Sequence, residues 1–174
     1  MTWPTEIDEM KTNEPAKETG PAAGEEAVPA AKAPKPVSAR KIDELTDAAL
    51  AAIKNRAAEL NITGVAVVAY AQGDSIQDWT SKMAVVGRMK IAPSTASRGN
   101  NFLAVAYAKA AEMADTLENS GTAKRPPMIG ELGWRGGLFA RVKTGCAIVA
   151  FSGASADEDV EVSQAGLEVL KAGL

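Results

Sequence analysis

The feature that most constrains the fold is a pair of short apolar segments joined by a glycine-containing link. Residues 138–142 (LFARV) and 146–151 (CAIVAF) flank residues 143–145 (KTG), which have the length and composition of a β-hairpin turn. Another run, residues 64–71 (GVAVVAYA), is short and rich in β-branched residues, as is typical of a buried strand. Strands joined by a hairpin are antiparallel neighbours, so the sequence predicts an antiparallel sheet.

A fourth strand is expected at residues 83–89 (MAVVGRM). Residues 72–82, which precede it, form either a long hairpin loop or an extra short strand. Residues 125–137 contain two prolines and four glycines, so we expect a shaped loop there rather than a helix or strand.

Three further segments have apolar residues at spacings of three and four, the pattern of amphipathic helices. The first begins after Ser38, a candidate N-cap, and ends near Asn61. The second begins at Asn100 or Asn101, and the third covers about residues 157–171. The predicted fold class is therefore α+β, with an antiparallel sheet flanked by N-terminal, middle and C-terminal helices.

Residues 1–37 differ in composition from the rest of the chain. They hold six of the nine prolines, four lysines and seven acidic residues, with few large aliphatic side chains. We expect a disordered Pro/Ala-rich tail, followed by one domain at residues 38–174. The net charge of −3 belongs to the tail, and the predicted domain is neutral. A neutral domain gives no electrostatic indication of nucleic-acid binding.

The N-terminal sequence and the single cysteine predict a cytoplasmic protein without a membrane-spanning segment. Residues 1–10 are acidic and interrupted by a proline, unlike a secretory signal. No apolar run approaches the roughly 20 residues that span a bilayer. Cys146 has no second cysteine to pair with, which fits a reducing compartment.

The chain contains no histidine. This excludes Ser-His-Asp and Cys-His catalysis, histidine-ligated zinc and an axial imidazole on haem. Any acid or base in this protein must be Asp, Glu, Lys, Tyr or Cys.

The loop at residues 128–137 has the residue types of a small-molecule site. Its glycines, Gly136 and Gly137 among them, allow the backbone to approach a ligand, while Glu131, Trp134 and Arg135 supply an acid, a flat apolar surface and a fixed cation. This combination suits a planar acidic molecule. The alternative is that the glycines permit a tight bend and that Trp134 covers the edge of the core or a subunit contact.

An acidic cluster opens the last predicted helix. Asp157 and Glu158 are candidate metal ligands, because hard cations such as Mg²⁺ or ferric iron prefer oxygen ligands. Acids in a first helical turn also stabilise the helix by opposing its dipole, and this alternative needs no metal. Carboxylates at this position disfavour phosphate binding.

Several short segments, in this order and at this spacing, resemble the GlcG/HbpS-like haem-degrading family, whose domain also forms the C-terminal part of PduO-type proteins. The segments are 64–68 (GVAVV), 106–110 (AYAKA), 136–138 (GGL), 152–153 (SG), 157–158 (DE) and 165–167 (AGL). The resemblance covers residues 38–174 and implies a profilin-like fold, homo-oligomers and, in some members, binding of haem, iron or a corrinoid. The chain departs from the family pattern in its longer insert at 72–82 and in Ala147 and Ala150, where glycines are common.

Isolated residues outside the loop add further candidates. One interpretation of Lys109 is a buried residue that supplies a cation for a propionate or acts as a general acid or base. The other is a solvated side chain. Tyr107 and Cys146 are candidate ligands of haem iron, and Cys146 is otherwise a small strand residue. Arg88 either binds a ligand or forms a salt bridge.

Three functions follow from these residues. The first is a cytoplasmic homo-oligomeric domain that binds haem or another planar small molecule beside residues 131–137, with haem- or iron-related activity. The second is an enzyme acting on a small carboxylate-bearing metabolite, with Glu131 or Lys109 as acid or base and Arg135 or Arg88 holding the carboxylate. The third is a non-catalytic assembly subunit whose residues 1–37 recruit a protein partner.

Overall fold

The structure is a computed structural model that describes residues 35–174. The predicted disorder of residues 1–37 therefore lies almost wholly outside the described residues. The elements in chain order are α1 (Ala39–Glu59), β1 (Gly64–Gln72), β2 (Thr80–Val86), β3 (Lys90–Ile91), β4 (Asn100–Asn101), α2 (Phe102–Thr116), β5 (Gly137–Val142), β6 (Gly145–Ser152) and α3 (Ala156–Gly173).

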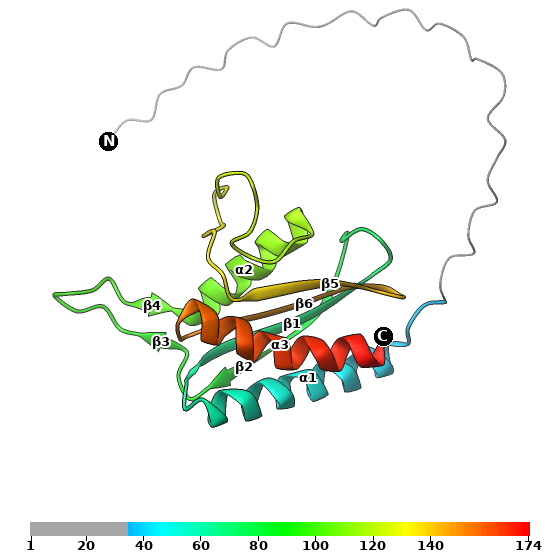
Figure 1. The fold of residues 1–174 in the computed structure, drawn as a ribbon, viewed down its shortest axis with the longest axis horizontal. Helices are drawn as coiled ribbons and strands as arrows, with labels where there is room; N and C mark the ends of the chain where they lie inside the picture. The colour runs from blue at the N-terminus through cyan, green and yellow to red at the C-terminus, as the bar shows by residue number, and fades with distance from the viewer. Residues whose placement is uncertain (1–34) are drawn as a thin grey trace, which may run out of the picture. The chain divides into compact units, whose positions relative to one another are not determined.

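Four strands form one antiparallel sheet in the order β2-β1-β6-β5 (Figure 1). The two hairpins β1–β2 and β5–β6 make its halves, and β1 pairs with β6 so that Val68 lies opposite Val149. These central strands are buried on both faces along almost their whole length. This explains why both read as continuous apolar runs rather than as alternating patterns.

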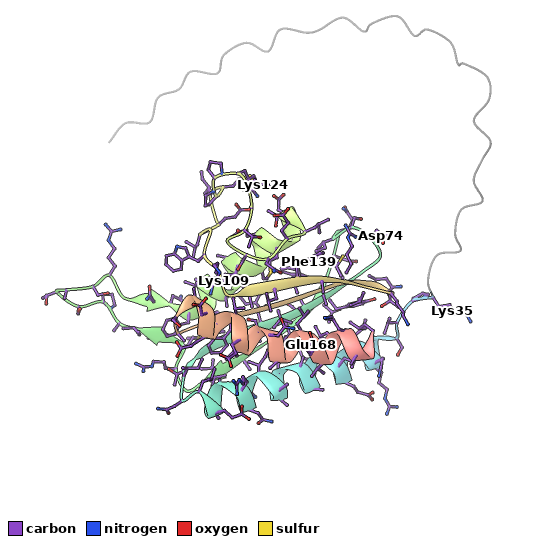
Figure 2. The ribbon with its side chains drawn as sticks, in the orientation of Figure 1. Lys35, Asp74, Lys109, Lys124, Phe139 and Glu168 are labelled. Atoms are coloured by element: carbon purple, nitrogen blue, oxygen red, sulfur yellow. The ribbon has the colours of Figure 1, made fainter. Side chains whose placement is uncertain are left out.

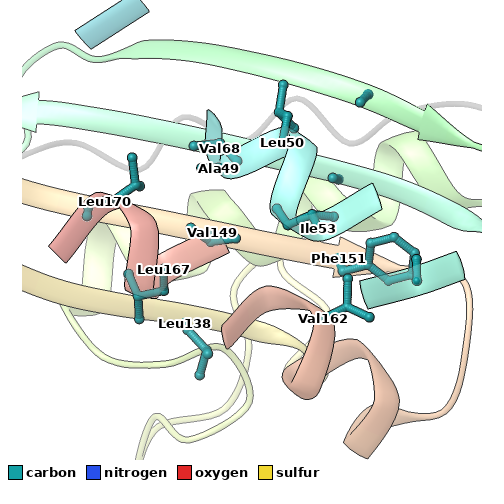
Figure 3. Packing of buried hydrophobic residues seen from close by; sticks show 14 residues of the cluster. Ala49, Leu50, Ile53, Val68, Leu138, Val149, Phe151, Val162, Leu167 and Leu170 are labelled. Atoms are coloured by element: carbon teal, nitrogen blue, oxygen red, sulfur yellow. The ribbon is translucent and has the colours of Figure 1, made fainter. Parts of the chain in front are cut away.

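Helices cover both faces of the sheet. Helices α1 and α3 lie side by side on one face, where Ile53, Phe151, Val162 and Leu170 are part of the core (Figure 3). Helix α2 packs on the other face, against a second cluster that includes Met113. The predicted α+β class and the antiparallel sheet with flanking helices are confirmed, and the arrangement is compatible with a profilin-like fold.

The predicted helix starts are also confirmed. The Ser38 hydroxyl accepts a hydrogen bond from the Lys41 N–H, and the Asn101 side chain accepts one from Ala104, so each acts as the N-cap of its helix. Ser155 and Glu158 form a reciprocal capping box at α3.

Between β1 and α2 the bounds of one expected strand need correction, and the structure decides between the two alternatives for the segment before it. The second strand covers residues 80–86 rather than 83–89, because Gly87 adopts a φ of 71° that ends the extended run. The connection at 73–79 is a hairpin loop without an extra strand. The short ribbon of β3 and β4 was not anticipated, since each strand has only two residues.

Within residues 35–174, no helix is long and apolar enough to cross a bilayer.

Candidate functional site

A cleft of ≈ 430 Å³ with a buried charged wall lies at the end of the sheet where β6 leads into α3. Helix α2 supplies Phe102, Val105 and Lys109 to its lining, and the loop before β5 supplies Trp134 and Arg135. The segment from Ser152 to Ala156 and the side chain of Asp159 complete this wall. Ile91 also lines the cleft, which therefore gathers residues that lie up to 68 positions apart in the sequence.

Lys109, labelled in Figure 2, forms a buried ion pair with Asp159 in the wall of this cleft. Their residues are 2% and 4% exposed, and Lys109 Nζ lies 2.7 Å from Asp159 Oδ2. Nζ also donates to the Phe151 carbonyl oxygen at 2.8 Å, and Asp159 Oδ1 accepts from the Ala154 N–H at 3.0 Å. An ammonium has three N–H donors, so these two contacts leave one donor of Lys109 for a ligand.

Burial shifts both groups of the pair towards their neutral forms. Desolvation lowers the pKa of Lys109 and raises the pKa of Asp159, and in each case the charge and hydrogen bond of the partner oppose the shift. The pair lies in a region of low dielectric, where each charge is stabilised by the opposite charge of its partner. Lys109 is therefore buried and not a solvated side chain, and its roles as a cation for a propionate and as a general acid or base stay predictions.

Gly136 makes room for this pair rather than contacting a ligand. A Cβ atom at Gly136 would lie 2.2 Å from Lys109 Nζ and 2.7 Å from Asp159 Cβ, and the residue has a φ of +126°. Its carbonyl oxygen accepts hydrogen bonds from the Ser163 hydroxyl at 2.7 Å and the Phe151 N–H at 3.2 Å. The geometry explains why glycine occupies this position.

Gly137 has a similar packing role. A Cβ there would lie 2.5 Å from Met113 Cε, and its N–H donates to the Ser120 hydroxyl at 2.8 Å. Neither of the two adjacent glycines lines the cleft. Both were predicted to contact a cofactor, and the structure places Gly136 against the ion pair and Gly137 against Met113 and Ser120.

Trp134 and Arg135 stand at the rim of the cleft. Trp134 is 51% exposed, and Arg135 Nη1 lies 3.0 Å from Asp157 Oδ1, with both side chains largely in solvent. Exposed ion pairs of this kind contribute little stability, so Arg135 can exchange Asp157 for a ligand at small cost. These two predicted binding residues are brought together with Lys109, as the sequence suggested.

Glu131 lies outside the cleft, and its carboxylate is paired with an arginine. Its carboxylate accepts from both Nη atoms of Arg125, at 2.7 and 2.8 Å, and from the Met128 N–H at 2.8 Å. These hydrogen bonds lower the pKa of Glu131 to about 2. At neutral pH the group is fully ionised, which makes it a poor general acid or base.

Four other candidates lie away from the cleft or have structural partners. Arg88 Nε donates to Thr63 Oγ1 at 2.9 Å, and Tyr107, on α2, is half-buried against the core. Glu158 caps α3, and Asp157 faces Arg135. In the part of the chain that the structure describes, no three His, Cys, Asp or Glu side chains are close enough to share a metal ion.

Sequence reasoning did not identify Asp159 as the partner of Lys109. The signal for Lys109 was present, because it shares a helix face with Ala106, Ala110 and Met113, where a lone cation needs a counter-charge. The partner lies 50 residues away among several acidic residues, and only the folded structure shows which of them contacts Lys109.

The fold and site together define a class: an α+β domain with an open cleft whose wall holds a buried lysine–aspartate pair. Comparison of the chain with protein-family models, with curated proteins and with solved structures finds no significant match. The resemblance to the GlcG/HbpS-like family therefore stays a prediction.

Proposed function

We propose that this domain binds a planar, carboxylate-bearing small molecule in the cleft. The observation that supports this most is the buried Lys109–Asp159 pair, which lines an open cavity instead of being enclosed in the core. A buried charge is costly, and one with a spare donor facing a cavity is typical of a binding site.

The size and lining of the cleft agree with a ligand of this kind. Its volume of ≈ 430 Å³ falls in the usual range for small-molecule sites, which are mostly apolar with a few polar groups. Phe102 and Val105 supply apolar wall, and Trp134 supplies a flat surface on which a ring can stack. Arg135 at the rim and Lys109 in the wall supply cations for carboxylates.

Haem fits the cleft only in part. Its ring and propionates suit these apolar and cationic groups. Its iron has no usual axial ligand there, since none of the described residues that line the cleft is His, Cys, Met or Tyr. The two candidate iron ligands do not line the cleft: Tyr107, on α2, packs against the core, and Cys146 contacts Gly73 at the other end of β6. We therefore propose the broader class of planar carboxylates, with tetrapyrroles as members bound through the ring and its acids.

A direct titration tests this proposal. The full chain is titrated with hemin and with metal-free protoporphyrin IX, and the dissociation constants are obtained from absorbance and fluorescence. We expect both to bind with similar affinity, because the cleft offers no iron ligand. Replacing the stacking surface in Trp134→Ala or the cation in Arg135→Ala should weaken binding roughly 3- to 10-fold, corresponding to about 0.7–1.4 kcal/mol.

Two exposed residues outside the cleft give matched controls. Ile129→Ala removes an apolar side chain from the same loop, and Arg40→Ala removes an arginine from α1. Neither should change the affinity. Absence of binding by both porphyrins, or equal effects of the site and control variants, would refute the proposal.

The enzyme alternative now depends on Lys109, because Glu131 is engaged by Arg125. Burial lowers the pKa of Lys109 towards that of a usable base. Conversion of a carboxylate-bearing substrate that is lost in Lys109→Met but kept in Glu131→Gln would favour it.

We further propose that the protein is a cytoplasmic homo-oligomer. Met128, Ile129, Leu132 and Trp134 expose apolar surface from one loop, and such patches favour association. Analytical ultracentrifugation tests this, with a monomer as the contradicting result.

A further inference from the structure

A second buried carboxylate on α2 has one oxygen without a partner. Glu112 is 2% exposed and lies three residues after Lys109. Its Oε1 atom accepts a hydrogen bond from the Gly121 N–H at 2.7 Å. Its Oε2 atom is buried and has no hydrogen-bond partner among residues 35–174. The great majority of buried polar atoms are paired, so this oxygen points to a group that comes from outside the domain.

The partner that this oxygen needs depends on the protonation state of Glu112. An ionised carboxylate only accepts hydrogen bonds, so Oε2 then needs a donor. A protonated carboxyl has an O–H group, which needs an acceptor instead. The surrounding charges decide which of the two partners fits.

Glu112 forms part of the wall of a hollow of ≈ 110 Å³, which Arg125 and Glu131 also line. Gly133 lines this hollow and the larger cleft, so the two cavities are neighbours. Water occupies about 30 Å³ per molecule in the liquid. The hollow is therefore large enough for about three or four non-hydrogen atoms, a much smaller ligand than the cleft.

The charges around the hollow favour a cation. Arg125 is shared by Glu131 and by Asp115, whose Oδ2 lies 2.5 Å from Nη2. Glu112 forms no ion pair among the described residues, so two carboxylates, those of Glu112 and Glu131, line the hollow beside one guanidinium that Asp115 also contacts. An added positive charge next to Glu112 would restore balance and supply the missing donor.

We propose that this hollow binds a small cation with N–H donors, either ammonium or the protonated end of a primary amine, through Glu112 Oε2. A metal ion is a weaker fit, because the described residues include no cluster of three potential metal-ligating side chains. An ammonium group donates a hydrogen bond to a single carboxylate oxygen and needs no such cluster. The inference is independent of the ligand in the cleft.

The test is a titration of the ¹⁵N-labelled full chain at constant ionic strength, with separate additions of ammonium, methylammonium, potassium and tetramethylammonium chloride. The Gly121 amide is the reporter, because its N–H is bonded to Glu112 Oε1. We expect saturable shifts of this amide with ammonium and methylammonium only. Potassium lacks N–H donors, and tetramethylammonium has the charge without them.

Glu112→Gln is the decisive variant, since it keeps the shape and the acceptor for Gly121 but removes the charge. We expect at least tenfold weaker binding, whereas Glu118→Gln, an exposed control just after α2, should bind as the wild type does. If Glu112→Gln does not fold, the wild-type melting temperature decides: it should rise with ammonium and methylammonium alone. Equal responses to potassium, no response to any cation, or unchanged binding in a folded Glu112→Gln variant would overturn the proposal.

Discussion

Replacing Lys109 by methionine should strongly destabilise the domain, because it leaves Asp159 ionised and unpaired in a buried site. Removing one partner of a buried ion pair typically costs about 3–5 kcal/mol. A loss of about 4 kcal/mol corresponds to a fall in melting temperature of about 8–16 °C for a chain of this size. Methionine fills a similar volume, so the loss reports the charge rather than a cavity.

A double-mutant cycle isolates the interaction between the two side chains. Asp159→Asn keeps an acceptor for the Ala154 N–H and removes the negative charge. The double variant Lys109→Met, Asp159→Asn buries no charge, so it should be more stable than Lys109→Met alone. Urea unfolding of the four proteins gives the coupling energy. If the two single losses add within about 0.5 kcal/mol, the pair is not coupled and the reasoning is refuted.

The same variant has a predictable dependence on pH. Burial raises the pKa of Asp159, and Lys109 opposes that shift, so the pKa should rise further in Lys109→Met. A carboxyl with a raised pKa in the folded state favours folding at low pH, and this stability is lost as pH rises through that pKa. The deficit of Lys109→Met should therefore be smaller at pH 4 than at pH 7. A deficit that grows on acidification would contradict this assignment.

Three further predictions concern residues around the site. Gly136→Ala should cost about 2–4 kcal/mol, measured by urea unfolding, because its Cβ would lie 2.2 Å from Lys109 Nζ at a φ of +126°; wild-type stability would show that the loop shifts freely. The pKa of Glu131 falls from 4.5 to about 2, so its stabilising effect is complete above pH 4.5 and is lost as pH falls towards 2. In acid-unfolding curves, the Glu131→Gln variant should lack the fall in stability between pH 4.5 and pH 2. A curve identical to that of the wild type would show that the Glu131–Arg125 pair does not cause this fall. Ser155→Ala removes the capping box of α3 and should lower thermal stability by about 0.5–2 kcal/mol, whereas an unchanged melting temperature would mean that the cap contributes nothing.

The elements that the sequence predicts well are those set by local chemistry. Ser38 and Asn101 act as N-caps because their side chains reach backbone N–H groups three residues ahead. The link at 143–144 joins β5 and β6 as a hairpin, and the two central strands are buried throughout, as their apolar composition suggests. The end of β2 was less predictable, because the residue types of Val85 and Val86 are the same whether the strand stops there or continues.

The site was predicted only in part, since its main contacts are non-local. Trp134 and Arg135 share a loop, and their residue types alone suggested a binding surface. Asp159 and Lys109 lie 50 residues apart, and no local pattern marks them as partners. The contact of Glu131 escaped for a different reason: its partner Arg125 is only six residues away, but the proline- and glycine-rich loop between them follows no regular period that would indicate the contact.

The most direct test of the central claim is to locate the bound ligand. In ¹H–¹⁵N spectra of the full chain, titration with protoporphyrin IX should shift the amides of Gly153, Ala154 and Arg135 most, because these residues line the cleft. The amides of α1, on the sheet face opposite α2, should not move. Shifts confined to α1 or spread evenly over the domain, or no shifts at all, would contradict binding in the cleft.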